Sequence, residues 1–358
     1  MPTTLRTNEI FSTLDNMIIS QVVMADNFSH EFKLVDEART DGGLYGDTKR
    51  YIAVDVLGID TWGGDTEAAN LLNLDRPADP DVQDIHLDKF KQIRLTVDYY
   101  LTKRAFMEEG SFMQFTNVMI GMLSETKQVF DNTTYNTFIG IDRCDSVAAP
   151  AQNVTIDVTS AVGSAIGLEA ARLRGTAIAE GIADLIDLLA DYSREYTDFG
   201  NLRSYSESSL KFIWNTEWVN RILKVDLPTI FHDEELKKHV FDRKLPARYF
   251  GTIQTSATTA NGATHRFIDA PDTTNTGSKY FAGDLIPSGT SLLANTYYIA
   301  DPDVICKIYV KLPPYMSAFS VGTSFFNPRS LTENHYLTFG YNTLVHLKNY
   351  PCITVTAI

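Results

Sequence analysis

Residues 231–239, FHDEELKKH, hold the densest group of side chains suited to metal or acid–base chemistry, with two histidines and three carboxylates. A zinc-binding helix has two histidines four positions apart with a glutamate between them, because that spacing puts both rings on one face. His232 and His239 are seven positions apart, and Asp233 stands where the N-cap of a helix is expected. The mixed charges therefore predict a solvated helix face and no metal site.

Two glycine-rich stretches also fall short of a chemical motif. GGLYGDTK (42–49) has two residues between its last glycine and its lysine and leads into a strand pattern, whereas a phosphate loop needs the lysine directly after the glycine and a helix next. AVGSAIG (161–167) places its serine wrongly for a nucleophile elbow. The sequence therefore predicts no catalytic residue and no cofactor. A site whose groups meet only in space stays open as an alternative, with His232, Glu234 and Glu235 as its candidates.

The composition is that of a folded, acidic protein. The chain has 358 residues, of which 44% are hydrophobic, and a net charge of −14. That charge argues against a protein that grips nucleic acid over its whole surface, because phosphate binding needs clustered lysine and arginine. No apolar run is long enough for a transmembrane helix or a secretion signal. Three cysteines without a CxxC pair, Cys144, Cys306 and Cys352, are predicted to be reduced.

The stretch KQIRLTVDYYLTKRAF (91–106) alternates apolar and polar residues, which is typical of a long strand with one apolar side. A second strand pattern, RYIAVDVLG (50–58), precedes it, and the polar, turn-rich residues between them predict an antiparallel hairpin. A strand of about 12 residues spans about 40 Å, whereas a chain of this length has a radius of gyration of about 20 Å. The hairpin is therefore predicted to cross the molecule or project from it, and its apolar side to need a neighbour.

The remaining patterns predict a mixed α+β fold. Residues 8–24 have the spacing of a short amphipathic helix, and a long helix is expected over 108–131. Further helices are expected over 164–196, with a buried stripe ending in Tyr192, and over 206–223. Residues 252–296 predict short strands and turns on a surface lobe. Strand patterns cover 153–160, 304–312 and the end of the chain, so the C-terminus is expected within a sheet.

This order of arm, β-ribbon, long helix, short strand, α/β lobe and closing strands resembles the major capsid proteins of tailed bacteriophages, the Hong Kong 97-like fold. The resemblance implies four regions along the chain. They are an N-terminal arm (1–38), an extended loop (39–105), a peripheral domain with a long spine helix (106–161 and 321–358) and an axial domain (162–320).

In that family the ribbon lies across the adjacent subunit of the same hexamer or pentamer. The resemblance therefore implies contacts between subunits on the apolar side of the ribbon, made by Tyr51, Val54, Val56, Ile93, Leu95, Val97, Tyr99 and Leu101. Burying such a side chain contributes about 1.5 to 3 kcal/mol, from which the entropy of association removes a large part.

The implied function is structural. It is an icosahedral shell that self-assembles in the host cytoplasm, encloses double-stranded phage DNA and becomes the virion. Partners would be other copies of the chain, a separate scaffold, a portal and DNA held without sequence-specific binding, with a decoration protein left open and no membrane. Two alternatives remain at this point: an encapsulin-like compartment around protein cargo, and a cytosolic α+β enzyme. An enzyme has no need of a projecting ribbon.

Overall fold

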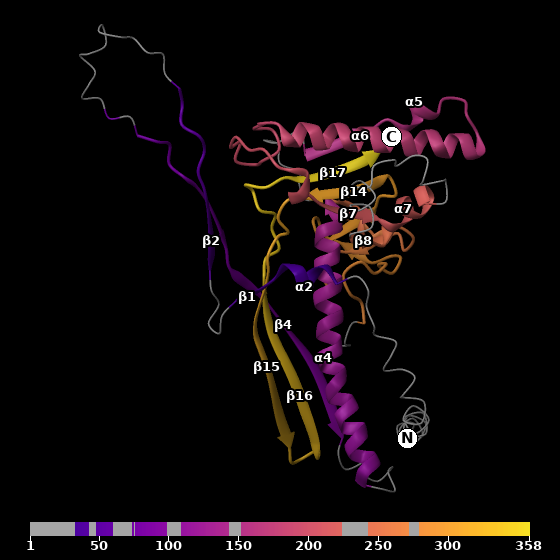
Figure 1. Ribbon diagram of the computed structural model, residues 1–358. Helices are drawn as coiled ribbons and strands as arrows, with labels where there is room; N and C mark the ends of the chain where they lie inside the picture. The colour runs from indigo at the N-terminus through magenta and orange to yellow at the C-terminus, as the bar shows by residue number, and fades with distance from the viewer. Residues whose placement is uncertain are drawn as a thin grey trace.

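The computed structural model describes residues 33–42, 48–59, 74, 76–98, 109–142, 152–223, 243–271 and 279–358. Its helices and strands form a mixed α+β fold, as predicted, and fall into three parts (Figure 1). An upper body holds most of the helices, an elongated half carries one long helix beside a sheet, and a two-stranded ribbon leads away from both.

The elongated half is a four-stranded sheet with helix α4 (Glu109–Gly140) beside it (Figure 1). Helix α2 (Leu34–Ala38) leads into the first strand and packs on α4, which is the predicted long helix and continues past residue 131 to Gly140. The strands, in spatial order, are β1 (Arg39–Asp41), β15 (Tyr315–Asn327), β16 (Thr332–Asn342) and β4 (Leu87–Asp98), with β1 parallel to β15 and the other neighbours antiparallel.

Strand β4 is the long strand predicted from residues 91–106, and its facing is confirmed over the described residues. Val97 is only 3% exposed and points to the same side as Ile93 and Leu95, whereas Arg94 on the other side is exposed. The predicted hairpin partner is wrong, because β4 pairs along its length with β16. Strand β2 (Lys49–Ala53) pairs instead with β3 (Asp81–Ile85). A five-residue strand could satisfy fewer than half of the backbone groups along β4, while β16 matches its length.

The upper body is built on a five-stranded sheet that includes the end of the chain. Its order is β6 (Asn153–Ile156), β17 (Cys352–Ala357), β14 (Val304–Tyr309), β7 (Lys211–Asn215) and β8 (Arg243–Leu245). Helices α5 (Val158–Val162) and α6 (Gly167–Ala190) follow β6, and α7 (Thr216–Leu223) follows β7. The prediction that the C-terminus lies within a sheet is confirmed.

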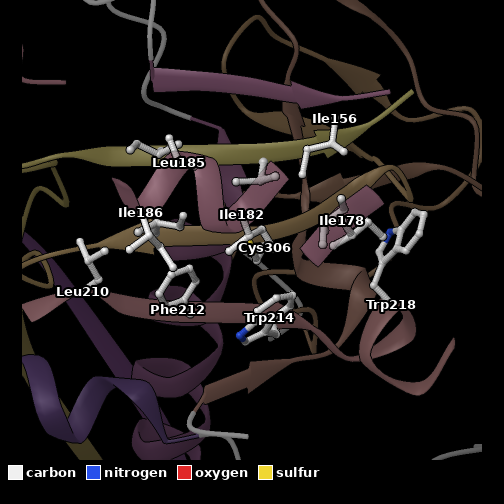
Figure 2. Close-up of a cluster of buried hydrophobic side chains, with 14 of the residues drawn as sticks. Ile156, Ile178, Ile182, Leu185, Ile186, Leu210, Phe212, Trp214, Trp218 and Cys306 are labelled. Atoms are coloured by element: carbon white, nitrogen blue, oxygen red, sulfur yellow. The ribbon is translucent and has the colours of Figure 1, made fainter. Parts of the chain in front are cut away.

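The core of the upper body forms between α6 and this sheet. Ile178, Ile182, Leu185 and Leu189 of α6 are buried at helical spacing, as the stripe predicted, but Tyr192 lies beyond the end of the helix and is 72% exposed. Figure 2 shows the α6 side chains gathered with Phe212 and Trp214 of β7 and with Cys306 of β14. This burial of large apolar side chains on both sides fixes α6 to the sheet.

The helix predicted over residues 206–223 is wrong in its first part. Residues 207–209 form one 3₁₀ turn, and Trp214 belongs to strand β7, while Trp218 belongs to helix α7. The change occurs at Asn215, whose side-chain oxygen accepts a hydrogen bond from the backbone N–H of Glu217 at 3.0 Å, as an N-cap does. Both tryptophans lie in the same core, so their spacing reflected a shared core and not a shared helix.

Short strands flank the body where small strands and turns were predicted for residues 252–296. One sheet has the order β11 (His265–Phe267), β13 (Tyr297–Ala300), β9 (Gly251–Ile253) and β5 (Ile141–Asp142), and β10 (Thr258–Thr259) pairs with β12 (Ser291–Leu292). A 3₁₀ turn at 247–249 precedes β9. The prediction is confirmed for the described part of this region.

The sheets can be compared with the regions that the resemblance implies. Strands β6 and β17, assigned to the peripheral domain, share a sheet with β14 and β7, assigned to the axial domain. The boundary at 320/321 falls inside β15, and that at 161/162 falls inside α5. Hydrogen bonding between strands joined these segments across long sequence separations. The division into an arm, an extended loop and two domains stays a prediction.

Two further predictions concern the cysteines and the membrane. Cys306 is a buried free thiol, as predicted, whereas Cys352 is in a disulfide bond, so the prediction of a reduced thiol is wrong at this position. Among the described residues, no helix has the length and apolar character needed to cross a bilayer.

Candidate assembly interface

The ribbon consists of the described residues 48–59, 74 and 76–86, with β2 and β3 at its base. Arg50 and Asp84 lie opposite each other on the two strands and form an ion pair with two hydrogen bonds of 2.8 Å. Figure 1 shows the ribbon leading away from the body and the sheet. Several large apolar side chains on it are exposed, namely Ile52, Val54, Val56, Leu57, Ile59, Leu74 and Val82. An isolated two-stranded ribbon with this surface is marginally stable in water.

Residues 194–203 of the body hold one strand of the ribbon. Asp55 forms an ion pair with Arg194 and accepts a hydrogen bond from the backbone N–H of Leu202 at 3.0 Å. Arg203 donates to the backbone oxygen of Val54 at 2.8 Å. The hydrogen bond from Arg194, followed by those from backbone N–H groups, lowers the pKa of Asp55 to about 2. The carboxylate is therefore charged at neutral pH, and its contacts with Arg194 and Leu202 attach this strand of the ribbon to the body.

The second strand of the ribbon is held by the loop before β17. The side chain of Gln83 donates to the backbone oxygen of His346 at 2.8 Å and accepts from the backbone N–H of Lys348 at 2.9 Å. Asn201 donates to the carboxylate of Asp81 at 3.1 Å. Both strands are thus attached to the body by polar contacts, while the apolar side chains further along the ribbon, such as Val56 and Ile59, are exposed.

The predicted contact residues divide into three groups. Val54 and Val56 lie on the ribbon and are 59% and 54% exposed. Tyr51 is half-buried against Ile85 of its own chain, and the ammonium group of Lys311 lies 5.3 Å from the centre of its ring. The residues on β4, which are Ile93, Leu95 and Val97, lie off the ribbon and turn toward their own chain. Tyr99 and Leu101 lie outside the described residues, as do His232, Glu234 and Glu235.

Sequence reasoning missed Ile52, Leu57 and Ile59, which are as exposed as the predicted valines. These three residues lie in or directly after the strand pattern at 50–58, which mixes apolar residues on both sides, so the pattern did not indicate a facing. A run of apolar residues on both sides of a short strand was the available signal. Contact of any of these residues with another subunit stays a prediction.

A buried ionic network holds the start of the described chain to the elongated half. Asp131 near the end of α4 is buried, accepts a hydrogen bond from the hydroxyl of Tyr315 at 2.6 Å, and pairs with Lys127 at 2.9 Å and Arg39 at 3.5 Å. The network therefore joins α4, β15 and β1. Among the described residues, no group of histidine, cysteine and acidic side chains could hold a metal ion.

A second ion cluster ties α2 to the sheet of the upper body. Glu37 pairs with Lys211 of β7 at 2.6 Å and with Arg243 of β8 at 2.8 Å. Burial alone would raise the pKa of Glu37, but the hydrogen bonds from Arg243 and Lys211 outweigh it, so the pKa lies below its ordinary value. These ion pairs attach α2, which packs on α4, to the sheet of the upper body.

No family model matches the sequence, and no curated protein matches it. Solved structures do match the fold. A chain in the capsid structure of Staphylococcus phage Andhra aligns over 92% of this chain and 84% of its own length, with a TM-score of 0.55 and 12% identity. The fold is that of a phage capsid protein. A chain in the structure of the head fiber and inner core protein gp22 of native bacteriophage P68 aligns over 87% of this chain and 80% of its own length, with a TM-score of 0.57 and 11% identity.

The likeness confirms the resemblance predicted from the order of the elements. At these identities it shows the capsid fold alone.

Proposed function

We propose that this chain is the major capsid protein of a tailed bacteriophage, which assembles as hexamers and pentamers into an icosahedral shell around double-stranded DNA. The observation that carries the proposal is the capsid fold combined with a ribbon that its own chain anchors at the base and leaves exposed along its apolar side chains. The chain acts as a structural subunit in the virion and not as an enzyme.

The ribbon supplies the contact that closes a ring. Each copy has one ribbon and one body, so a ribbon laid on the next body makes a head-to-tail contact. A series of such contacts forms a closed ring when 360° is a whole multiple of the rotation between neighbouring copies. Burying an exposed valine or isoleucine fully contributes about 1.5 to 3 kcal/mol. Several such residues per contact offset part of the entropy lost on association. Repetition around the ring makes many modest contacts sufficient.

The other partners follow from the same proposal. Enclosed DNA does not need a tight binding surface, which agrees with the net charge of −14. Assembly takes place in the host cytoplasm with a separate scaffold and a portal, and the outer surface is open to a decoration protein. An encapsulin-like compartment is the alternative within the same fold, and its content distinguishes it.

Negative-stain microscopy of the chain expressed in bacteria tests the proposal. We expect closed shells, or rings that close into shells when a scaffold is supplied, and nuclease-protected DNA in particles from infected cells. Particles that hold only protein would favour the compartment. A chain that stays monomeric or dimeric under every assembly condition would rule out the capsid function.

A matched pair of variants tests the role of the ribbon. Val56→Asp puts a charge on the exposed apolar part of the ribbon, and Leu188→Asp puts one on an exposed leucine of α6. We expect Val56→Asp to abolish rings and Leu188→Asp to keep them, with unfolding midpoints unchanged in both because neither side chain is buried. Rings that survive Val56→Asp would remove the ribbon from the proposal.

A further inference from the structure

Residues 321–327 of β15, which we call the open edge, have a strand partner on one side only within the described part of the chain. Strand β16 pairs with them on the inner side. On the other side β1 covers β15 at residues 315–317 and stops, and an irregularity in the pairing follows between Ala318 and Val321. The backbone N–H and C=O groups of the open edge that point away from β16 therefore have no strand partner among the described residues and can pair with another strand.

The open edge lacks the features by which sheets normally prevent pairing with other chains. Its sequence, VGTSFFN, contains no charged residue and no proline. Phe325 is 61% exposed, Phe326 is 50% exposed and Val321 is exposed as well. The opposite edge of the same sheet, β4, is protected in the usual way by charged residues, namely Lys89, Lys91, Arg94 and Asp98. One edge of the sheet is therefore closed to pairing and the other is not.

Helix α4 does not shelter the open edge. Val97, Glu333 and Phe326 lie in one row across β4, β16 and β15, on the side of the sheet that faces α4. Their exposure rises from 3% at Val97, through a partly buried Glu333, to half-exposed at Phe326. The apolar surface beside β15 is consequently half-exposed at Phe326, and a strand added at the open edge would cover part of it.

We propose that the open edge pairs with the same edge of a second copy of this chain, antiparallel and centred on Ser324. In this register Val321 lies opposite the partner's Asn327, Gly322 opposite the partner's Phe326, and Thr323 opposite the partner's Phe325. The space where a Cβ of Gly322 would sit is open, so the ring of the opposing phenylalanine covers the glycine. Because the pairing is two-fold symmetric, each of these residue pairs occurs twice in the interface. No charged side chain is buried in it. Pro328, which has no N–H to donate, ends the pairing directly after Asn327.

The ribbon contact closes a ring, whereas this contact would join one ring to another. In assigning that role, the inference rests on the proposed function. Head-to-tail contacts close rings, but rings need a second kind of contact to join into a shell. A two-fold pairing of open edges joins one ring to the next. An unidentified partner protein would have no reason to match the self-complementary order of glycine, serine and phenylalanine along this edge.

Disulfide cross-linking tests the register. Directly opposed residues of an antiparallel pair have Cβ atoms about 4.5 to 5.5 Å apart, close to the separation in a disulfide. Ser324→Cys meets its own symmetry mate, so mild oxidation of assembled particles should convert most of the protein into a reducible dimer. Arg329→Cys, in the turn after the open edge, should give only the trace seen for the unsubstituted chain. A Ser324→Cys variant without dimer, or one that links only to Val56→Cys on the ribbon, would overturn the proposal.

A charge test separates this contact from the ribbon contact. Thr323→Lys places an ammonium group beside the partner's Phe325, whereas Gln92→Lys adds the same charge on the same side of the sheet at the protected edge. We expect rings without shells for Thr323→Lys, and shells for Gln92→Lys. Shells formed by Thr323→Lys as readily as by the unsubstituted chain would overturn the pairing. Absence of rings in the unsubstituted chain would instead refute the proposed function.

Discussion

Removal of the Tyr315 hydroxyl should destabilise the subunit more than removal of another buried tyrosine hydroxyl. The hydroxyl donates to the buried carboxylate of Asp131 at 2.6 Å. Burial, followed by the charge of Asp131, raises the pKa of Tyr315 far above its ordinary value, so the hydroxyl keeps its proton and donates at every working pH. Tyr315→Phe keeps the ring, which packs against Tyr135 and Tyr341, and deletes only this bond.

The magnitude follows from the charge on the acceptor. A hydrogen bond to an ionised group contributes about 1.5 to 3 kcal/mol, against about 0.5 to 1.5 kcal/mol for a neutral pair. Asp131 retains Lys127 at 2.9 Å, which places Tyr315→Phe near the lower end, at about 2 kcal/mol. Tyr298→Phe is the matched control, because its buried hydroxyl donates at 2.7 Å to a neutral backbone oxygen; it should cost about 1 kcal/mol.

Urea unfolding of unassembled subunits measures the difference. The midpoints should shift while the slope of the transition stays constant, because the surface exposed on unfolding does not change. Combining Tyr315→Phe with Asp131→Asn should cost less than the sum of the two single changes, since both remove the same bond. Equal losses for the two tyrosine variants, or strictly additive losses in the double variant, would show that the ionic network does not hold β15 to α4.

Three further predictions use matched comparisons. The attachment of the ribbon through Asp55 should be complete above the ordinary carboxyl pKa of 3.8 and lost as the pH falls toward about 2; hydrogen exchange at the ribbon base should rise in that window, and Asp55→Asn should remove the pH dependence. Ile182→Ala should cost about 2 to 5 kcal/mol in denaturant unfolding, and Tyr192→Ala less than about 0.5 kcal/mol, because only the first is buried. On α4, Gly140→Ala should lower the thermal midpoint, since its Cβ would lie 2.2 Å from a backbone oxygen of the neighbouring turn, whereas Gly121→Ala has open space and should raise it.

Local patterns predicted strands and helices better than they predicted partners. The alternation in residues 91–98 gave the strand β4 and its buried side, because each depends on neighbouring residues alone. Its partner, β16, begins at Thr332, and nothing in the alternation of one strand identifies which distant strand completes it. Proximity in sequence favoured β2 as the partner of β4. In the structure β4 pairs with β16, which matches its length and can satisfy its backbone hydrogen bonds.

The buried end of α4 shows a different limit. The predicted helix ended at residue 131, whereas α4 continues to Gly140 and residues 131–140, several of them asparagine and threonine, are all buried. Thr133 satisfies its hydroxyl within the helix by donating to the backbone oxygen of Val129 at 2.8 Å. Asp131 is satisfied by residues far away in the sequence. Burial of polar residues depends on partners that a one-dimensional pattern does not contain.

The candidate interface was predictable in kind but not in detail. A projecting apolar ribbon was expected, and Val54 and Val56 are exposed on it. Strand β4 was expected on the ribbon but pairs with β16, so Ile93, Leu95 and Val97 turn toward their own chain, and their contact with another subunit stays a prediction. Exposure is a property of the whole fold, because it depends on whether α4 and β16 happen to cover a given strand.

The place of β17 between β6 and β14 imposes an order on synthesis. Strand β6 is synthesised about 200 residues before its sheet neighbour, residues 352–357. The pairing of Val154 and Ile156 is therefore delayed until β17 has been synthesised. At roughly 5 to 20 residues per second this delay is about 10 to 40 s. During translation the nascent subunit therefore exposes apolar side chains of β6, and its upper sheet is complete only after β17 has been synthesised.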